Sequence, residues 1–281
     1  NMGTLQQSAG DLILVTNGNG AATVVNNAAI DFGTSNVGGA LDVTASAGTI
    51  TQNGGALTVA GTSAFTTSTN DQAITLSNTT NALTGAVAFT TGGTTGNVVI
   101  DNGTTGLDLA ASTINGTLTA TGGASAGIVD SGNVAVAGNV TLTTDAGNGV
   151  INMGTLQQSA GDLILVTNGT GAATVVNNAG IDFGTSNVGG ALSATASAGN
   201  ITQNGGAITV AGTSSFILGA NSANVVLDHA SNAFSGAVTL LAGAGGSQAF
   251  GNVTFVDDSA VKIDANADAA GDLYLNAGTD G

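Results

Sequence analysis

The chain has 281 residues and a formal net charge of −16, because one basic residue, Lys262, accompanies 17 acidic residues, all of them Asp. A nucleic-acid partner requires Lys or Arg to neutralise its phosphates, so this composition argues against nucleic acid and against anionic membrane surfaces. With no Cys and a single His, His229, a disulfide framework and a thiolate metal site are excluded and enzyme chemistry is not expected.

Short strands are predicted by a recurring form, Gly-x-(Leu or Val)-x-(Val, Leu or Phe), in which apolar residues alternate with small or polar ones. In chain order the form begins at Gly10, Gly39, Gly55, Gly85, Gly106, Gly116 and Gly138. Abundant Gly, Thr and Val and the absence of Glu disfavour helices. Apolar runs such as residues 12–15 last about four residues, whereas a membrane-spanning helix needs about 20, so no membrane span is expected.

The strand form recurs at a regular interval, which separates Leu118 from Val140 and, equally, Val87 from Leu109. This period predicts an all-β fold, a parallel β-helix or β-solenoid, with about 22 residues and three short strands in each coil. The absence of Pro is consistent with it, since almost every backbone N–H of such a stack is needed for pairing. Four aromatic residues fall on apolar positions and are predicted to stack in the core: Phe65, Phe89, Phe216 and Phe255.

A second, longer period relates the two halves of the chain. Residues 1–65 and 152–216 differ at seven of 65 aligned positions, an offset of 151. Farther on, GNVVID at Gly96 matches GNVTFVD at Gly251 with an offset of 155, which indicates about four inserted residues within 243–249. We therefore expect one continuous solenoid over residues 1–281, with a long unit of about seven coils over 1–151 and a second, partial copy over 152–281. Neither end of the sequence resembles a coil that would cap the stack. We therefore expect the stack to continue, either in a longer chain or onto another copy.

Two stretches carry a resemblance to a known group: GGALDVTASAGTITQNGGALTVAGTSAF over 38–65 and GGALSATASAGNITQNGGAITVAGTSSF over 189–216. They resemble the repeats of large bacterial surface exoproteins of the filamentous-haemagglutinin and autotransporter-adhesin type, and the similarity extends over essentially the whole chain. The resemblance implies a right-handed parallel β-helix at the bacterial cell surface. It also implies a role in long stiff fibres that mediate adhesion, cell-cell contact or matrix formation.

The expected function is accordingly a structural and adhesive shaft segment of a long extracellular bacterial fibre or surface adhesin. One alternative is a self-assembling filament subunit whose copies stack end to end through uncapped coils. The other is a calcium-dependent surface-layer or matrix protein. Few charges and many Thr, Ser and Asn side chains suit contact with cell-surface glycans, neighbouring cells or further copies of the same repeats.

The calcium alternative depends on acidic residues near the carboxyl end. Asp264, Asn266 and Asp268 have the D-x-N-x-D spacing that opens an oxygen-rich calcium loop, and Asp272 follows. The run departs from the EF-hand pattern at Ala269, where Gly is expected, so solvated Asp side chains at solenoid corners are the favoured interpretation. No other cofactor is expected.

No catalytic residue is expected elsewhere. The Asp pairs that recur with the long unit, Asp11 with Asp162 and Asp31 with Asp182, lack an accompanying aromatic or Arg cluster that would bind a sugar for hydrolysis. The Thr residues are scattered in the sequence, so the sustained Thr ladder of ice-binding solenoids is not evident.

Overall fold

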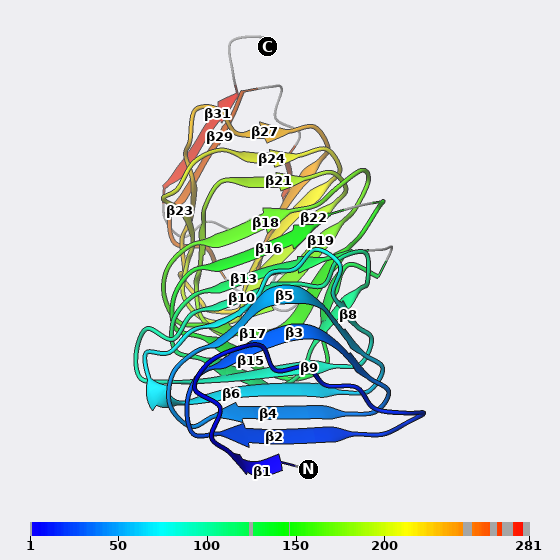
Figure 1. The fold of residues 1–281 in the computed structure, drawn as a ribbon. Helices are drawn as coiled ribbons and strands as arrows, with labels where there is room; N and C mark the ends of the chain where they lie inside the picture. The colour runs from blue at the N-terminus through cyan, green and yellow to red at the C-terminus, as the bar shows by residue number, and fades with distance from the viewer. Residues whose placement is uncertain are drawn as a thin grey trace.

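The computed structural model describes residues 2–123, 126–145, 147–243, 249–258, 263–265 and 272–277. Within them the chain forms 31 β-strands, and no helix there is long and apolar enough to cross a membrane. The strands pair in parallel with partners about 22 residues away and build a β-solenoid of about 11 turns. Figure 1 shows these turns stacked from the N-terminus at the bottom towards the C-terminus at the top. The predicted all-β parallel solenoid and its coil length are confirmed.

Two sheets run along the stack, and each coil contributes to both. Sheet A has 15 strands: β1 (Met2–Leu5), β2 (Ala22–Asn26), β4 (Leu41–Ala45), β6 (Ser63–Asn70), β9 (Val87–Gly92), β11 (Leu107–Leu109), β12 (Ser112–Ile114), β14 (Ile128–Asp130), β15 (Val134–Val136), β17 (Ile151–Gln158), β19 (Ala173–Asn177), β22 (Leu192–Ala196), β25 (Ser214–Leu218), β28 (Val238–Ala242) and β30 (Ile263–Ala265).

Sheet B has 16 strands: β3 (Ile30–Val37), β5 (Ile50–Val59), β7 (Ile74–Leu76), β8 (Ala82–Leu83), β10 (Val98–Asp101), β13 (Leu118–Gly122), β16 (Val140–Thr144), β18 (Leu163–Val166), β20 (Ile181–Phe183), β21 (Ser186–Val188), β23 (Ile201–Gln203), β24 (Ile208–Val210), β26 (Val225–Leu227), β27 (Ala233–Phe234), β29 (Val253–Asp257) and β31 (Leu273–Ala277).

The core lies between the sheets and follows from the alternation of side chains along each strand. In β4, for example, Leu41, Val43 and Ala45 point inward and are buried, whereas Asp42 and Thr44 point outward. All four predicted core aromatics, Phe65, Phe89, Phe216 and Phe255, are fully buried, which confirms the prediction. They belong to two groups of touching rings, one made of Phe32, Phe65 and Phe89 and the other of Phe183, Phe216, Phe234 and Phe255.

Most coils combine one straight strand with one bent pair of short segments, which gives the predicted three strands per coil, whereas, within the described residues, the coils of β28–β29 and β30–β31 have one strand in each sheet. In the first coils the straight strands, such as β2 and β4, lie in sheet A and the bent segments, such as those of β3, lie in sheet B. In the middle coils the arrangement is reversed, since the bent pairs β11–β12 and β14–β15 lie in sheet A and the straight strands β13 and β16 lie in sheet B. After β18 the bend returns to sheet B as β20–β21 and β23–β24.

The predicted insertion is visible in the strand register. Ile74 of β7 pairs with Val98 of β10 in the next coil. The counterpart Val225 of β26 pairs with Val253 of β29, although the interval between these two positions in the sequence is longer by four. The added residues fall in the connection between β28 and β29, so the strand ladder continues past them.

Candidate functional site

Where the bend changes from one sheet to the other, straight and bent backbones do not match in register, and buried side chains complete the hydrogen bonding. Above the straight strand β18 lies the bent pair β20–β21, and Ser186 is the first residue of its second segment, β21. The buried hydroxyl oxygen Oγ of Ser186 accepts a hydrogen bond from the backbone N–H of Leu165 at 3.1 Å and donates to the carbonyl of Gly184 at 3.0 Å. Ser35 and Ser112 bond to Leu14 and Phe89 in the same way, at 3.0 Å each. The serine Oγ thus acts as the hydrogen-bond acceptor in place of a backbone carbonyl, which the bend moves out of the ladder.

The opposite end of a bent region is closed by a buried Asn or Asp side chain. The side-chain Oδ1 of Asn177 accepts the N–H of Gln158 at 2.8 Å, and its Nδ2 donates to the carbonyls of Gln158 at 3.0 Å and Gly180 at 2.7 Å. Asn26 and Asn102 repeat this arrangement in earlier coils. In a later coil the buried Asp257 accepts the N–H of Phe234 at 3.1 Å. Each of these Asn side chains therefore satisfies three backbone groups at a swap, which is the place where the bend changes from one sheet to the other.

Substitution of the swap serine tests this role. Ser186→Ala is expected to lower the free energy of unfolding by about 1–2 kcal/mol, because the buried N–H of Leu165 loses its acceptor. Urea unfolding of the variant measures the loss, and amide hydrogen exchange at Leu165 locates it. Ser193→Ala, on the outward face of β22, is the control and should change stability by less than about 0.5 kcal/mol. Equal effects of both variants would contradict the assignment.

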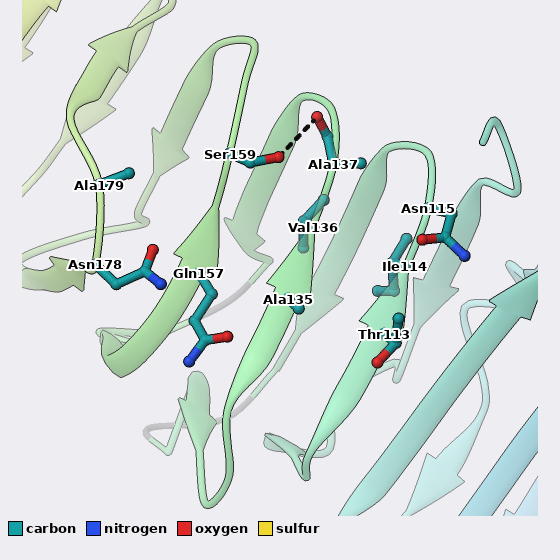
Figure 2. Close-up of a pocket in the computed structure, with 10 residues that line it drawn as sticks. All are labelled: Thr113, Ile114, Asn115, Ala135, Val136, Ala137, Gln157, Ser159, Asn178 and Ala179. Atoms are coloured by element: carbon teal, nitrogen blue, oxygen red, sulfur yellow. Dashed lines mark hydrogen bonds between the residues drawn. The ribbon is translucent and has the colours of Figure 1, made fainter.

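A shallow groove of about 450 Å³ lies on the outer surface where a bent region of sheet A ends. Figure 2 shows the ten lining residues, with Thr113 of β12, Ala135 of β15 and Gln157 of β17 on successive strands. These three residues pair directly in register. The list is completed by Ile114, Asn115, Val136, Ala137, Ser159, Asn178 and Ala179. None of the ten is charged, so the groove offers hydroxyl and amide groups rather than an acid, a base or a metal ligand.

The residues predicted as a calcium loop are only partly described. Asp264 lies in β30, where its backbone pairs with Thr239, and Asn266 and Asp268 lie outside the described residues. Asp272 is exposed, and its backbone N–H donates to Oδ1 of Asn252 at 3.1 Å. No group of three or more His, Cys, Asp or Glu residues that could hold a metal occurs in the part of the chain that the structure describes. Calcium binding by this segment stays a prediction.

One of the recurring Asp pairs, Asp31 with Asp182, makes hydrogen bonds between neighbouring coils. The carboxylate of Asp31 accepts from the Thr51 hydroxyl at 3.0 Å and from Nδ2 of Asn53 at 2.9 Å. The carboxylate of Asp182 makes the equivalent bonds to Thr202 and Asn204. These acids are occupied by contacts between coils.

His229 and Lys262 each occur once in the chain and have no counterpart in the other long copy. The exposed His229 accepts the backbone N–H of Ser231 through Nδ1 at 3.1 Å, as Asn78 at the matching corner accepts that of Thr80. His229 therefore lies at an exposed corner of the solenoid. Lys262 lies outside the described residues.

A pH-dependent contact is expected at Asp71. Hydrogen bonds from the backbone N–H groups of Thr94 and Thr95 to Oδ1, at 2.7 and 2.9 Å, lower the pKa of this carboxyl below its ordinary value of 3.8. The ionised form is therefore favoured by folding, and its contribution is complete above pH 3.8 and is lost as the pH falls through the lower pKa of the folded state. Amide exchange at Thr94 and Thr95 should accelerate, relative to the exposed amide of Thr170, over this acidic range. Asp71→Asn should abolish that pH dependence, and an unchanged profile in the variant would contradict the assignment.

These features define a tandem-repeat protein with a β-solenoid fold. A family model described as repeats of unknown function (DUF5649) matches residues 19–90, 95–166 and 170–241, more than half of the chain. The chain therefore belongs to this family. No curated protein and no solved structure matches it.

The family repeat explains why the bend changes sheets. Successive matches begin 76 and 75 residues apart, which is close to three and a half coils of about 22 residues. Counterpart strands of neighbouring repeats must then lie in opposite sheets, as β2 in sheet A, β10 in sheet B and β19 in sheet A do. The first and third matches begin 151 residues apart, the same interval as the long unit in the sequence.

Proposed function

We propose that this chain is a structural and adhesive shaft segment of a long extracellular bacterial fibre and that it has no enzymatic activity. The observation that carries the proposal is the continuity of the two sheets through every change of the bend, with the swap hydrogen bonds made by residues such as Ser186 and Asn177. A shaft requires an unbroken ladder, because each interruption would act as a hinge.

The geometry of the stack supports stiffness along one axis. Each coil bonds to the coil before it and the coil after it, so bending the rod requires many backbone hydrogen bonds to stretch together. At the usual distance between strands, about 11 turns give a rod about 53 Å long. The recurrence of near-identical units suits a part whose function depends on length.

Location and adhesion rest on the resemblance of residues 38–65 and 189–216 to repeats of bacterial surface exoproteins. The hydroxyl-rich surface, with few charges and only one basic residue, supports the same proposal. It presents hydrogen-bonding groups without a strong positive field, which suits contact with glycans or with further copies of the repeat.

Electron microscopy of native material, combined with its denatured mass, tests the shaft. Filaments built from a polypeptide much larger than 26.5 kDa are expected. Filaments built from a chain of that size would instead support the end-to-end stacking subunit, and disassembly by a calcium chelator would support the calcium-dependent alternative. Compact particles without filaments would contradict all three. Antibodies against the chain should label intact cells, and labelling only after cell lysis would contradict the surface location.

A further inference from the structure

The groove of Figure 2 contains a local departure from its own repeat. In the third bent coil of the first family repeat, an outward Ala82 precedes the buried Leu83, and in the third repeat Ala233 precedes the buried Phe234. The middle repeat places Gln157 and Gln158 there. The correspondence follows from the swap bonds, since the N–H groups of Leu83, Gln158 and Phe234 all bond to the closing Asn or Asp side chain.

The two glutamines change the chemistry of this position in different ways. Gln158 is 4% exposed and occupies a place where the sister coils bury an apolar side chain. Its Nε2 lies 3.1–3.2 Å from the carbonyl oxygens of Gly138, Ala160, Gly161 and Asp162, so its buried amide is satisfied and ties the corner next to Ser159, which lines the groove. Gln157 instead lines the groove itself, where the sister coils carry only the methyl group of an alanine.

The groove is also longer than one hollow. A second hollow shares Gln157 and Asn178 with it and extends to Ser197, and a third shares Ser159 and Ala179 and extends to Thr202. Thr113, Ala135 and Gln157 alone span three successive coils along the axis, about 10 Å. The surface therefore fits an extended chain lying along the rod.

The chemistry of the lining selects an uncharged ligand. Thr113, Gln157, Ser159 and Asn178 offer hydroxyl and amide groups that donate and accept hydrogen bonds, and Figure 2 shows the amides of Gln157 and Asn178 on neighbouring coils. A formal net charge of −16 repels polyanions. We propose that this groove binds a neutral oligosaccharide chain; the proposal rests on the adhesive part of the proposed function and names its site.

The glutamine corner of the site recurs along the rod. The same sequence, LQQSAG, begins at Leu5 and at Leu156, and Asn27 donates its N–H to the carbonyl of Leu5 at 3.1 Å as Asn178 does to that of Leu156. The two copies are seven coils apart, so they face the same side at a distance of about 34 Å. A long glycan lying along the rod can contact both corners, and weak contacts at each corner then sum to firmer attachment.

Nuclear magnetic resonance of the side-chain amides tests the proposal on the whole chain. The probes are neutral laminarihexaose, cellohexaose and mannohexaose, with an anionic hyaluronan hexasaccharide for comparison. At least one neutral probe should shift the amide signals of Gln157 and Asn178 in a saturable manner, and hyaluronan should not. Gln6→Ala/Gln157→Ala should weaken binding about tenfold or more. This variant installs the residue that the sister coils carry at positions 82 and 233, so folding is expected to be retained.

The control is Asn36→Ala, an exposed amide on the corresponding row of the first repeat, which should leave binding unchanged. The site is overturned if no neutral hexasaccharide shifts these signals, if the double variant binds as well as the parent chain, or if hyaluronan binds most tightly. Filament formation is measured separately by microscopy, so filaments without oligosaccharide binding would overturn the groove and leave the shaft function standing.

Discussion

Asn177→Ala is expected to lower the free energy of unfolding by about 3 kcal/mol, because three backbone groups, two of them buried, lose their partners together. They are the N–H and carbonyl of Gln158 and the carbonyl of Gly180. Urea unfolding followed by circular dichroism measures the change. Hydrogen exchange at the amide of Gln158 should accelerate more than exchange in β4, which lies many coils away.

The control for this variant is Asn36→Ala, whose exposed side chain lies outside the core and should cost less than about 0.5 kcal/mol. A loss below about 1 kcal/mol for Asn177→Ala would mean that water or a shifted backbone satisfies the three groups and that the swap does not depend on the asparagine.

Phe216→Ala is expected to cost about 3–5 kcal/mol, the range for removal of a fully buried aromatic ring. The ring centroid of Phe216 lies 6.1 Å from that of Phe183 and 5.9 Å from that of Phe234. Because Phe216 belongs to sheet A and the other two to sheet B, its removal leaves a cavity in the core between the sheets. Urea unfolding measures the loss, and hydrogen exchange should show that β25 and its neighbours open first.

Phe216→Leu is the matched variant for that experiment. The repeat itself shows that Leu can replace Phe in this layer, since Leu240 occupies the place of Phe89 one long unit later. The Leu variant should therefore lose clearly less than the Ala variant. Equal losses would show that ring contacts, rather than filled volume, stabilise this part of the core.

The coil and its core could be predicted because apolar residues recur in the sequence once in every coil of about 22 residues. Apolar positions such as Leu118 and Val140 are one period apart in the sequence and directly paired in β13 and β16. The inward direction of Phe65 follows from the alternation within its strand. Neither conclusion requires knowledge of how far the bend extends in a given coil.

The change of the bend between sheets was not predictable from the comparison of the two long copies. Two family repeats amount to about seven whole coils, so the long offset returns each strand to its own sheet and conceals the half-turn within it. The alignment of Thr residues on one sheet was also not visible in the sequence. Thr44, Thr66, Thr90 and Thr113 lie in one file on sheet A, although their spacing along the chain varies from coil to coil. The file is short, since Val25 precedes Thr44 in it and Ala135 follows Thr113.

The groove was also missed by sequence reasoning. Gln157 is matched by Gln6 at the offset of 151, so the comparison of the two long copies shows no difference at this position. A comparison of neighbouring family repeats would have set it against Ala82 and Ala233. The calcium residues illustrate a different limit, because a spacing such as that of Asp264, Asn266 and Asp268 does not determine whether oxygen atoms converge.

Each family repeat exceeds three whole coils by about half a coil, so an even and an odd number of repeats have different effects on the rod. Loss or gain of a single family repeat would turn every downstream coil to face the opposite side, and all later grooves would change sides with it. Loss or gain of two repeats restores the original facing and alters only the length, by about 34 Å. A fibre that must keep its contacts on one side can therefore lengthen only in even steps, and the near identity of residues 1–65 and 152–216 is what duplication in such a double step produces.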